Sequence, residues 1–197
     1  EPPQLEGQCT PLAPAAQIRF TGMADPNQLT LPALYQHLAA TGLVRRLLEL
    51  ARDEDLGVGP ARGDITSTVC LTPSKHATAE LVARAGGVIS GLATLPDLIR
   101  VFGYQIDFTT TAKDGDRVPA GTIIATLSGA EQDLLTLERT ALNLIGRLSG
   151  IATRTAEFVA EMMRGGAVRA RLYDTRKTTP GLRCLEKYAV RCGGGFC

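Results

Sequence analysis

Residues 167–183 read Ala167-Val-Arg-Ala-Arg-Leu-Tyr-Asp-Thr-Arg-Lys-Thr-Thr-Pro-Gly-Leu-Arg183. The first seven residues favour a β-strand, and Pro180-Gly181 predicts a turn into a helix. Arg176 and Lys177 lie between the two elements. A strand that ends in fixed cations and turns into a helix is how α/β folds present positive charge to an anionic ligand. The segment therefore predicts an α/β fold that binds an acidic small molecule, with cations that are merely solvated as the alternative.

The distribution of charge supports a local anion site. The 197-residue chain has a net charge of +1. Residues 166–197 contain 7 basic and 2 acidic residues, whereas residues 1–165 contain 14 basic and 18 acidic residues. A near-neutral total argues against a dedicated nucleic-acid binder. The basic excess around Arg176 and Lys177 strengthens the prediction of an anionic ligand.

Cysteine and histidine usage indicates no metal site. The 5 cysteines form no Cys-x-x-Cys pair, and no histidine lies near enough to them in the sequence to suggest a zinc site. We therefore assign no metal ligands. An odd cysteine count without a secretory signal is typical of the reducing cytoplasm. No apolar run approaches the roughly 20 residues that span a bilayer, so we expect a cytoplasmic protein without a membrane partner.

Periodicity predicts the remaining elements. We expect a helix over residues 30–55 that breaks at Gly42, and a helix over residues 131–148 that Gly150 separates from a second helix. Further expected elements are strands at 77–83, 87–91 and 105–111, a turn with a proline-bearing edge and a strand within 114–129, and helices at 95–102, 151–163 and 182–192. Residues 1–22 show no periodicity and are expected to be a disordered tail or vector remnant.

The helix predicted at 131–148 has one apolar and one polar stripe. The polar stripe consists of Thr136, Arg139, Thr140, Asn143 and Arg147. Arg139 is the residue of interest because a guanidinium can bind a carboxylate with two parallel hydrogen bonds. From the residues alone, we favour a solvated Arg139 paired with Glu138 or Asn143.

Residues 114–129 resemble the half-repeat of biotinyl and lipoyl carrier domains. Those carriers need an exposed acceptor lysine in a tight hairpin, and no lysine occurs between Lys113 and Lys177. We therefore do not expect a carrier function, although a related β-sandwich shape is expected.

Five motifs in order resemble quinolinate phosphoribosyltransferase, also called nicotinate-nucleotide pyrophosphorylase (carboxylating). The resemblance covers roughly residues 34–197. Its motifs are Glu54-Asp-Leu-Gly with Gly63-Asp-Ile-Thr-Ser67, Leu137-Glu-Arg-Thr-Ala-Leu-Asn143, Leu148-Ser-Gly-Ile-Ala-Thr153, Asp174-Thr-Arg-Lys-Thr-Thr-Pro-Gly-Leu-Arg183 and Lys187-Tyr-Ala-Val-Arg-Cys-Gly-Gly-Gly195.

The resemblance implies a two-domain enzyme. Residues 23–165 would form an N-terminal α/β sandwich domain with helices, and residues 166–197 the first βα unit of an open C-terminal α/β barrel. Since one strand and one helix cannot bury both faces of such a unit, we expect a piece of a longer protein that is inactive alone.

The resemblance also implies an activity and a binding site. The family converts quinolinate and phosphoribosyl pyrophosphate (PRPP) to nicotinate mononucleotide, pyrophosphate and CO2 for NAD biosynthesis, with Mg²⁺. By match to its motifs, Thr175, Arg176 and Lys177 bind the substrate, and Arg139 reaches quinolinate in the other subunit of a homodimer with a shared active site. No catalytic side chain is assigned.

Three alternatives remain. The chain could belong to a related enzyme, such as a nicotinate phosphoribosyltransferase or a molybdenum-transport-associated homologue. It could be a non-catalytic biotinyl- or lipoyl-like domain, or a structural fragment that dimerises without chemistry.

Overall fold

The computed structural model describes residues 25–59, 63–64, 67, 69, 75–166 and 169–197. Its helices are α1 (Leu31–Ala40), α2 (Leu43–Leu56), the 3-10 helix η1 (Leu92–Thr94), α4 (Leu95–Phe102), α5 (Glu131–Arg164) and α6 (Arg183–Cys192). Its strands are β1 (His76–Val82), β2 (Gly87–Val88), β3 (Ile106–Thr110), β4 (Arg117–Val118) and β5 (Ile123–Ala130). The tail predicted at residues 1–22 lies outside the described residues.

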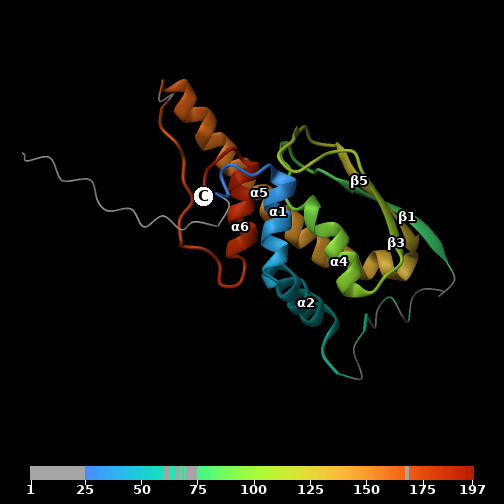
Figure 1. Ribbon diagram of the computed structural model, residues 1–197. Helices are drawn as coiled ribbons and strands as arrows, with labels where there is room; N and C mark the ends of the chain where they lie inside the picture. The colour runs from blue at the N-terminus through green and yellow to red at the C-terminus, as the bar shows by residue number, and fades with distance from the viewer. Residues whose placement is uncertain (1–24, 60–62, 65–66, 68, 70–74, 167–168) are drawn as a thin grey trace, which may run out of the picture.

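The strands form two antiparallel sheets, with the order β1-β5-β3 in the larger and β2-β4 in the smaller. Strand β5 pairs along both edges, so that Leu127 faces Ala79 on β1 and Phe108 on β3. Alternate residues of β5 (Ala125, Leu127 and Gly129) are buried, because one face of the sheet is covered and the other is open. Helix α5 contacts both β1 and β5. This mixed α/β architecture, with an antiparallel sheet and packed helices, confirms the predicted fold class (Figure 1).

Helix α5 is one continuous helix of 34 residues, so the predicted break at Gly150 is wrong. Glycine inside a helix costs roughly 1 kcal/mol relative to alanine. Two neighbours of Gly150, Leu148 and Ala152, are both 0% exposed, and the apolar stripe to which they belong is buried along the helix. Burying several such side chains outweighs the cost of one glycine.

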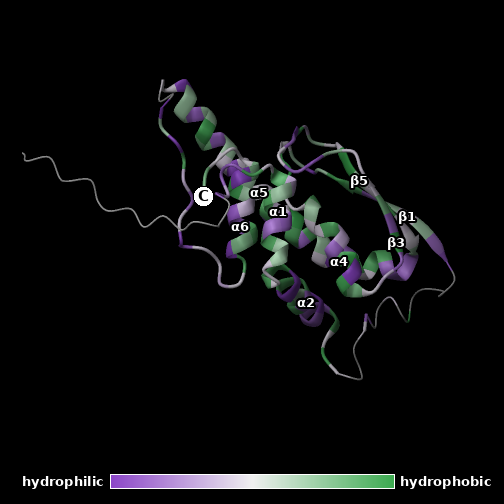
Figure 2. Ribbon diagram, viewed as in Figure 1, coloured by the Kyte–Doolittle hydropathy of each residue, from purple (hydrophilic) through white to green (hydrophobic). Residues whose placement is uncertain are grey.

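Other local predictions are confirmed. Gly42 has φ 75° and separates α1 from α2, because only glycine adopts this left-handed conformation readily. Helix α4 begins one residue before Pro96, as expected, and α6 ends at Cys192, with Gly193 as its cap. Figure 2 shows hydrophobic and hydrophilic residues alternating around the helices, as expected where one side of each is buried. None of the described helices is long and apolar enough to cross a membrane.

Hydroxyl groups join α5 to the short strand β2. Thr153 Oγ1 accepts the Val88 N–H at 2.8 Å, and Ser149 Oγ accepts the Ser90 N–H at 3.0 Å. The Thr153 hydroxyl also donates to Val88 O, and the Ser149 hydroxyl to Ser90 O. The two side chains, one helical turn apart, thus satisfy the strand edge in place of another strand.

The strand predicted at residues 167–173 is wrong over its described part. Among residues 169–175, Tyr173 alone forms a bridge, in parallel with Phe196. The Phe196 N–H donates to Leu172 O at 2.8 Å, and the Asp174 N–H donates to Phe196 O at 2.9 Å. A parallel strand needs hydrogen-bond partners along its whole length. In the described residues this segment pairs with Phe196 alone.

Candidate active site

Residues 174–179, here called the cationic loop, are anchored at their first residue by a partly buried ion pair. Lys187 Nζ on α6 donates to both carboxylate oxygens of Asp174 at 2.6 Å. The Asp174 side chain is 9% exposed and the Lys187 side chain 28%. Because the Asp174 carboxylate binds Lys187, the start of the loop is attached to α6.

The last residue of the cationic loop is anchored by two side chains. The Thr179 N–H donates to Glu186 Oε2 at 3.0 Å, and Arg147 Nη2 on α5 donates to Thr179 Oγ1 at 2.5 Å. The same guanidinium donates to Glu186 Oε1, from Nη2 at 2.5 Å and from Nε at 3.2 Å. Thr179, Glu186 and Arg147 therefore form a closed triangle of hydrogen bonds, here called the loop clamp.

Electrostatics keeps the loop clamp charged. Burial acts to raise the pKa of the Glu186 carboxyl, but the hydrogen bonds from Arg147 and Thr179 and the positive charge of Arg147 hold that pKa below its ordinary value. Glu186 is therefore an anion at neutral pH, able to accept from both partners at once.

A tight turn connects the cationic loop to α6. The Leu182 N–H donates to Thr179 O at 3.0 Å, and Gly181 has φ 84°. Pro180 followed by a glycine with positive φ is the pattern of a type II turn. The predicted Pro-Gly turn is thus confirmed, and it brings Glu186 back to the loop.

The predicted ligands Thr175, Arg176 and Lys177 lie in the middle of the cationic loop and are exposed. Thr175 Oγ1 accepts the Lys177 N–H at 3.1 Å, which stabilises a local turn. Neither the Arg176 nor the Lys177 side chain has a hydrogen-bond or ion-pair partner in the part of the chain that the structure describes. The two charges are therefore available to an anion.

A cavity of about 340 Å³ lies beside the loop. Thr175 and Lys177 line it together with Arg147 and Lys187, whereas Arg176 does not. Asp174 and Glu186 also line the cavity and pair with Lys187 and Arg147, so Lys177 is the cation of this lining that is left to attract an acidic ligand.

Arg139 does not join these residues within one chain. Its Nη1 donates to Asp55 Oδ1 on α2 at 2.7 Å, and not to Glu138 or Asn143 as expected from the residues alone. The hydrogen bond and the negative charge of Asp55 raise the pKa of Arg139. Since Arg147 is 8 positions after Arg139 on α5, their Cα atoms lie roughly 12 Å apart along the helix.

Arg139 lines a second, separate cavity of about 520 Å³ between α2 and α5. Asp55 and Asn143 contribute to it, as do Pro180 and Leu182 beyond the cationic loop. Arg147 lines both cavities and so lies between the two groups of predicted ligands.

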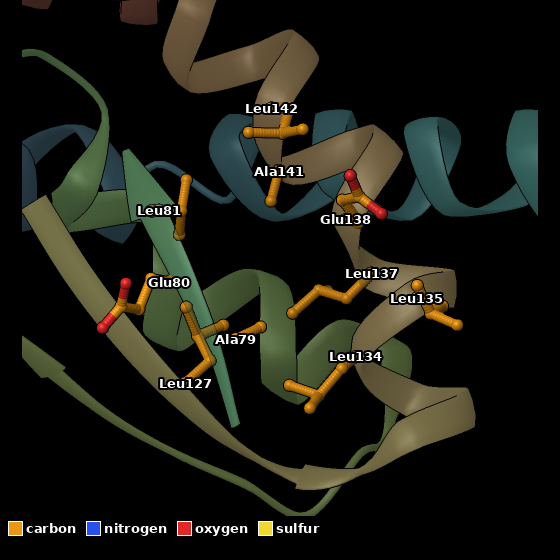
Figure 3. Close-up of a pocket in the computed structure, with 10 residues that line it drawn as sticks. All are labelled: Ala79, Glu80, Leu81, Leu127, Leu134, Leu135, Leu137, Glu138, Ala141 and Leu142. Carbon is orange, nitrogen blue, oxygen red and sulfur yellow. The ribbon is translucent and has the colours of Figure 1, made fainter. Parts of the chain in front are cut away.

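Figure 3 shows a third pocket, of about 240 Å³, which does not suit an acidic ligand. Its walls are mainly apolar side chains of β1, β5 and α5, such as Leu81, Leu127 and Leu137. The charged residues that line it, Glu80 and Glu138, are both acidic and would repel an anion.

Three residues of the site were not predicted as such: Arg147, Glu186 and Lys187. Arg147 lies on the same polar stripe as Arg139, and Lys187 begins the last of the five family motifs. An acid adjacent to a base at the start of α6 was the available signal for Glu186 and Lys187. Their partners are 39 and 13 residues away, so the pairing required the fold.

Comparison with known families identifies the class of protein. The model "Quinolinate phosphoribosyl transferase, N-terminal domain" matches residues 64–149, and the model for the C-terminal domain of the same family matches residues 151–196. The chain belongs to the quinolinate phosphoribosyltransferase family. The junction between the two matches lies inside α5, so this helix is shared by both matched segments.

Individual relatives carry the corresponding enzyme names. The chain is 41% identical over 153 residues to a probable nicotinate-nucleotide pyrophosphorylase [carboxylating] of Bacillus subtilis, covering 78% of this chain and 50% of the relative. It is 42% identical over 161 residues to the Mycobacterium leprae enzyme, covering 80% and 52%. The chain thus spans about half the length of these curated relatives.

A solved structure shows the same fold. The nicotinate-nucleotide pyrophosphorylase of Francisella tularensis superposes with a TM-score of 0.72 at 34% identity, covering 88% of this chain and 56% of that one. Family membership replaces the carrier-domain alternative, since the residues that suggested it lie within the matched N-terminal domain.

Proposed function

We propose that this chain forms part of an enzyme that converts quinolinate and PRPP to nicotinate mononucleotide, pyrophosphate and CO2, a step of NAD biosynthesis. The observation that carries the proposal is the cationic loop, anchored at Asp174 and Thr179, with Arg176 and Lys177 exposed between the anchors. Both family matches, in order along one chain, support it.

Quinolinate is a pyridine dicarboxylate with two negative charges. Arg176 offers a planar pair of donors that matches one carboxylate, and Lys177 offers a compact charge. Two cations on an anchored loop would orient the ring nitrogen toward the anomeric carbon of PRPP without the entropic cost of ordering the loop.

The proposed reaction needs no side-chain nucleophile. The pyridine nitrogen forms a bond to the anomeric carbon, and pyrophosphate leaves with the electron pair of the broken bond. The carbon–carbon bond to the 2-carboxylate then breaks, CO2 leaves, and a proton takes its place on the ring. The cationic ring nitrogen accepts the developing electron pair, so the protein contributes position and charge.

Mg²⁺ is proposed as the companion of PRPP, because a diphosphate presents the oxygen ligands that this ion prefers. In the described residues no three of His, Cys, Asp and Glu are grouped so that they could hold a metal ion. We therefore assign no residue of this chain to Mg²⁺ and derive no step through it.

We propose that two copies share each active site, with Arg139 of one copy facing the cationic loop of the other. The argument is geometric, because Arg139 lines a different cavity from Thr175 and Lys177 in the same chain. The Arg139 side chain is 74% exposed and is paired with Asp55, which is 14% exposed. A dianionic ligand could therefore approach Arg139 from solvent and compete with Asp55 for it.

The domain division is proposed to remain as expected, with residues 23–165 in the N-terminal domain and 166–197 opening the barrel domain. Helix α5 ends at Arg164, one residue before that boundary.

A steady-state assay of the full-length enzyme tests the function. With PRPP and Mg²⁺, quinolinate should yield nicotinate mononucleotide and CO2 in equal amounts, and nicotinate should be a poor substrate. Preference for nicotinate would instead favour the related phosphoribosyltransferase, and turnover of neither would leave the molybdenum-transport-associated homologue.

A further inference from the structure

We propose that Arg147 and Glu186 are positioning residues that hold the cationic loop ready to bind the substrate dianion. This inference rests on the proposed function, because it assumes that Arg176 and Lys177 bind quinolinate. It adds a role for the loop clamp, whose members do not include any of the predicted ligands.

The anchors of the cationic loop are chemically complementary. Consecutive residues of α6 serve opposite ends of the loop, with the base Lys187 holding Asp174 and the acid Glu186 holding Thr179. The loop is therefore a bridge of 6 residues fixed at both ends, and three of the four residues between the anchors are the predicted ligands. A loop closed in this way loses less conformational entropy when it binds a ligand.

Arg147 links the two matched segments of the chain. It lies on α5 within the N-terminal match, whereas Thr179 and Glu186 lie within the C-terminal match. Its guanidinium satisfies Glu186 Oε1 and the hydroxyl of Thr179 together, so the loop cannot leave this position without breaking the contacts of Thr179 with Arg147 and Glu186.

The geometry of a guanidinium is needed for this task. Nη2 reaches the Thr179 hydroxyl and Glu186 Oε1, each at 2.5 Å, while Nε reaches Glu186 Oε1 as well. A lysine would place a single ammonium where the fork now contacts two groups. The side chain of Glu186 is 11% exposed, so its charge requires a fixed partner.

Thr179→Val is the cleanest test, because valine keeps the shape of the exposed threonine and removes the hydroxyl that Arg147 contacts. We expect the KM for quinolinate to rise about tenfold, as expected for one hydrogen bond to a charged group, with kcat and the KM for PRPP little changed. Thr179→Ser, which restores a hydroxyl, should recover most of the loss.

Arg147→Met should have the larger effect, because it also leaves Glu186 without its charged partner. Arg154→Met is the matched control: Arg154 lies 7 residues further along α5 and pairs with Glu157 away from the loop. The control should leave the KM for quinolinate unchanged.

Hydrogen exchange on the 197-residue chain gives a readout that does not depend on activity. The amides of residues 177–179 should exchange several-fold faster in Thr179→Val than in Thr179→Ser, at equal melting temperature. Wild-type turnover of quinolinate with the same KM and the same exchange rates in both Thr179 variants would overturn the positioning role. If the amides exchange faster in Thr179→Val but the wild-type enzyme does not turn over quinolinate, the proposed function would be rejected. The role of the loop clamp in holding the loop would still be supported.

Discussion

Tyr188 on α6 donates its phenolic hydroxyl to Asp114 Oδ2 at 2.8 Å, across 74 residues of sequence. The same carboxylate accepts the N–H groups of Leu92 and Ala93 at 2.9 and 3.0 Å, at the start of η1. Burial is the main cause that raises the pKa of Asp114, against the effect of these hydrogen bonds. Asp114 belongs to the segment that resembles carrier domains. Its structural role is to attach α6 to the start of η1.

Tyr188→Phe should destabilise the chain by about 1–2 kcal/mol, because it removes a hydrogen bond to a buried carboxylate and leaves that carboxylate with one partner fewer. The free energy of unfolding in urea would measure the effect. Tyr173→Phe is the control, since Tyr173 is 55% exposed. Equal stabilities of the two variants would show that the Asp114 contact contributes nothing.

Gly193→Ala should destabilise the contact between α6 and α5. A Cβ at Gly193 would lie 2.4 Å from Ala152 O and 2.6 Å from Thr155 Cβ, so backbone must shift. Overpacking of this kind costs about 1–3 kcal/mol.

Gly150→Ala is the matched substitution on α5, because a Cβ there meets nothing within 4 Å. It should stabilise the chain by up to about 1 kcal/mol through the better helix propensity of alanine. Melting temperatures should therefore shift in opposite directions for the two glycines, and a loss of stability at Gly150 would contradict the open surface seen here.

Arg139→Ala should raise the KM for quinolinate at least about tenfold in the full-length enzyme, while the chain still folds. The Arg139 side chain is 74% exposed, but Asp55 is 14% exposed and loses its charged partner in the variant, so the melting temperature should also fall. Arg154→Ala, another exposed arginine of α5, is the control. An unchanged affinity for quinolinate would remove Arg139 from the site.

Arg176→Lys should lower kcat/KM for quinolinate at least about tenfold, since an ammonium cannot make the paired hydrogen bonds of a guanidinium to one carboxylate. Arg164→Lys, at the exposed C-terminal end of α5, serves as the control because it changes the same residue type away from the loop. Wild-type kinetics for Arg176→Lys would show that charge alone is sufficient at this position.

Glu186→Gln should change how stability depends on pH. The pKa of Glu186 is lower in the folded chain than its ordinary value of 4.5, so its ionised form stabilises the fold above that pH. This contribution is lost as pH falls below 4.5 and through the folded pKa. The difference in unfolding free energy between the wild type and Glu186→Gln should therefore shrink on acidification, and a constant difference between about pH 7 and about pH 3 would be inconsistent with the clamp.

Much of the local structure follows from the sequence alone. The break at Gly42 and the start of α4 beside Pro96 depend on the conformational limits of glycine and proline, which act within a few residues. The five ordered motifs likewise indicate the family by themselves, because each is a short run of neighbouring residues.

The tertiary structure decided the features that depend on distant partners. Gly150 is a poor helix residue, and only burial of the stripe around Leu148 keeps α5 continuous. The pairing of Arg139 with Asp55 joins residues 84 positions apart, and that of Arg147 with Glu186 joins residues 39 apart. Local propensity carries no information on which charges meet, because that choice is made when the helices pack and bring their polar faces together.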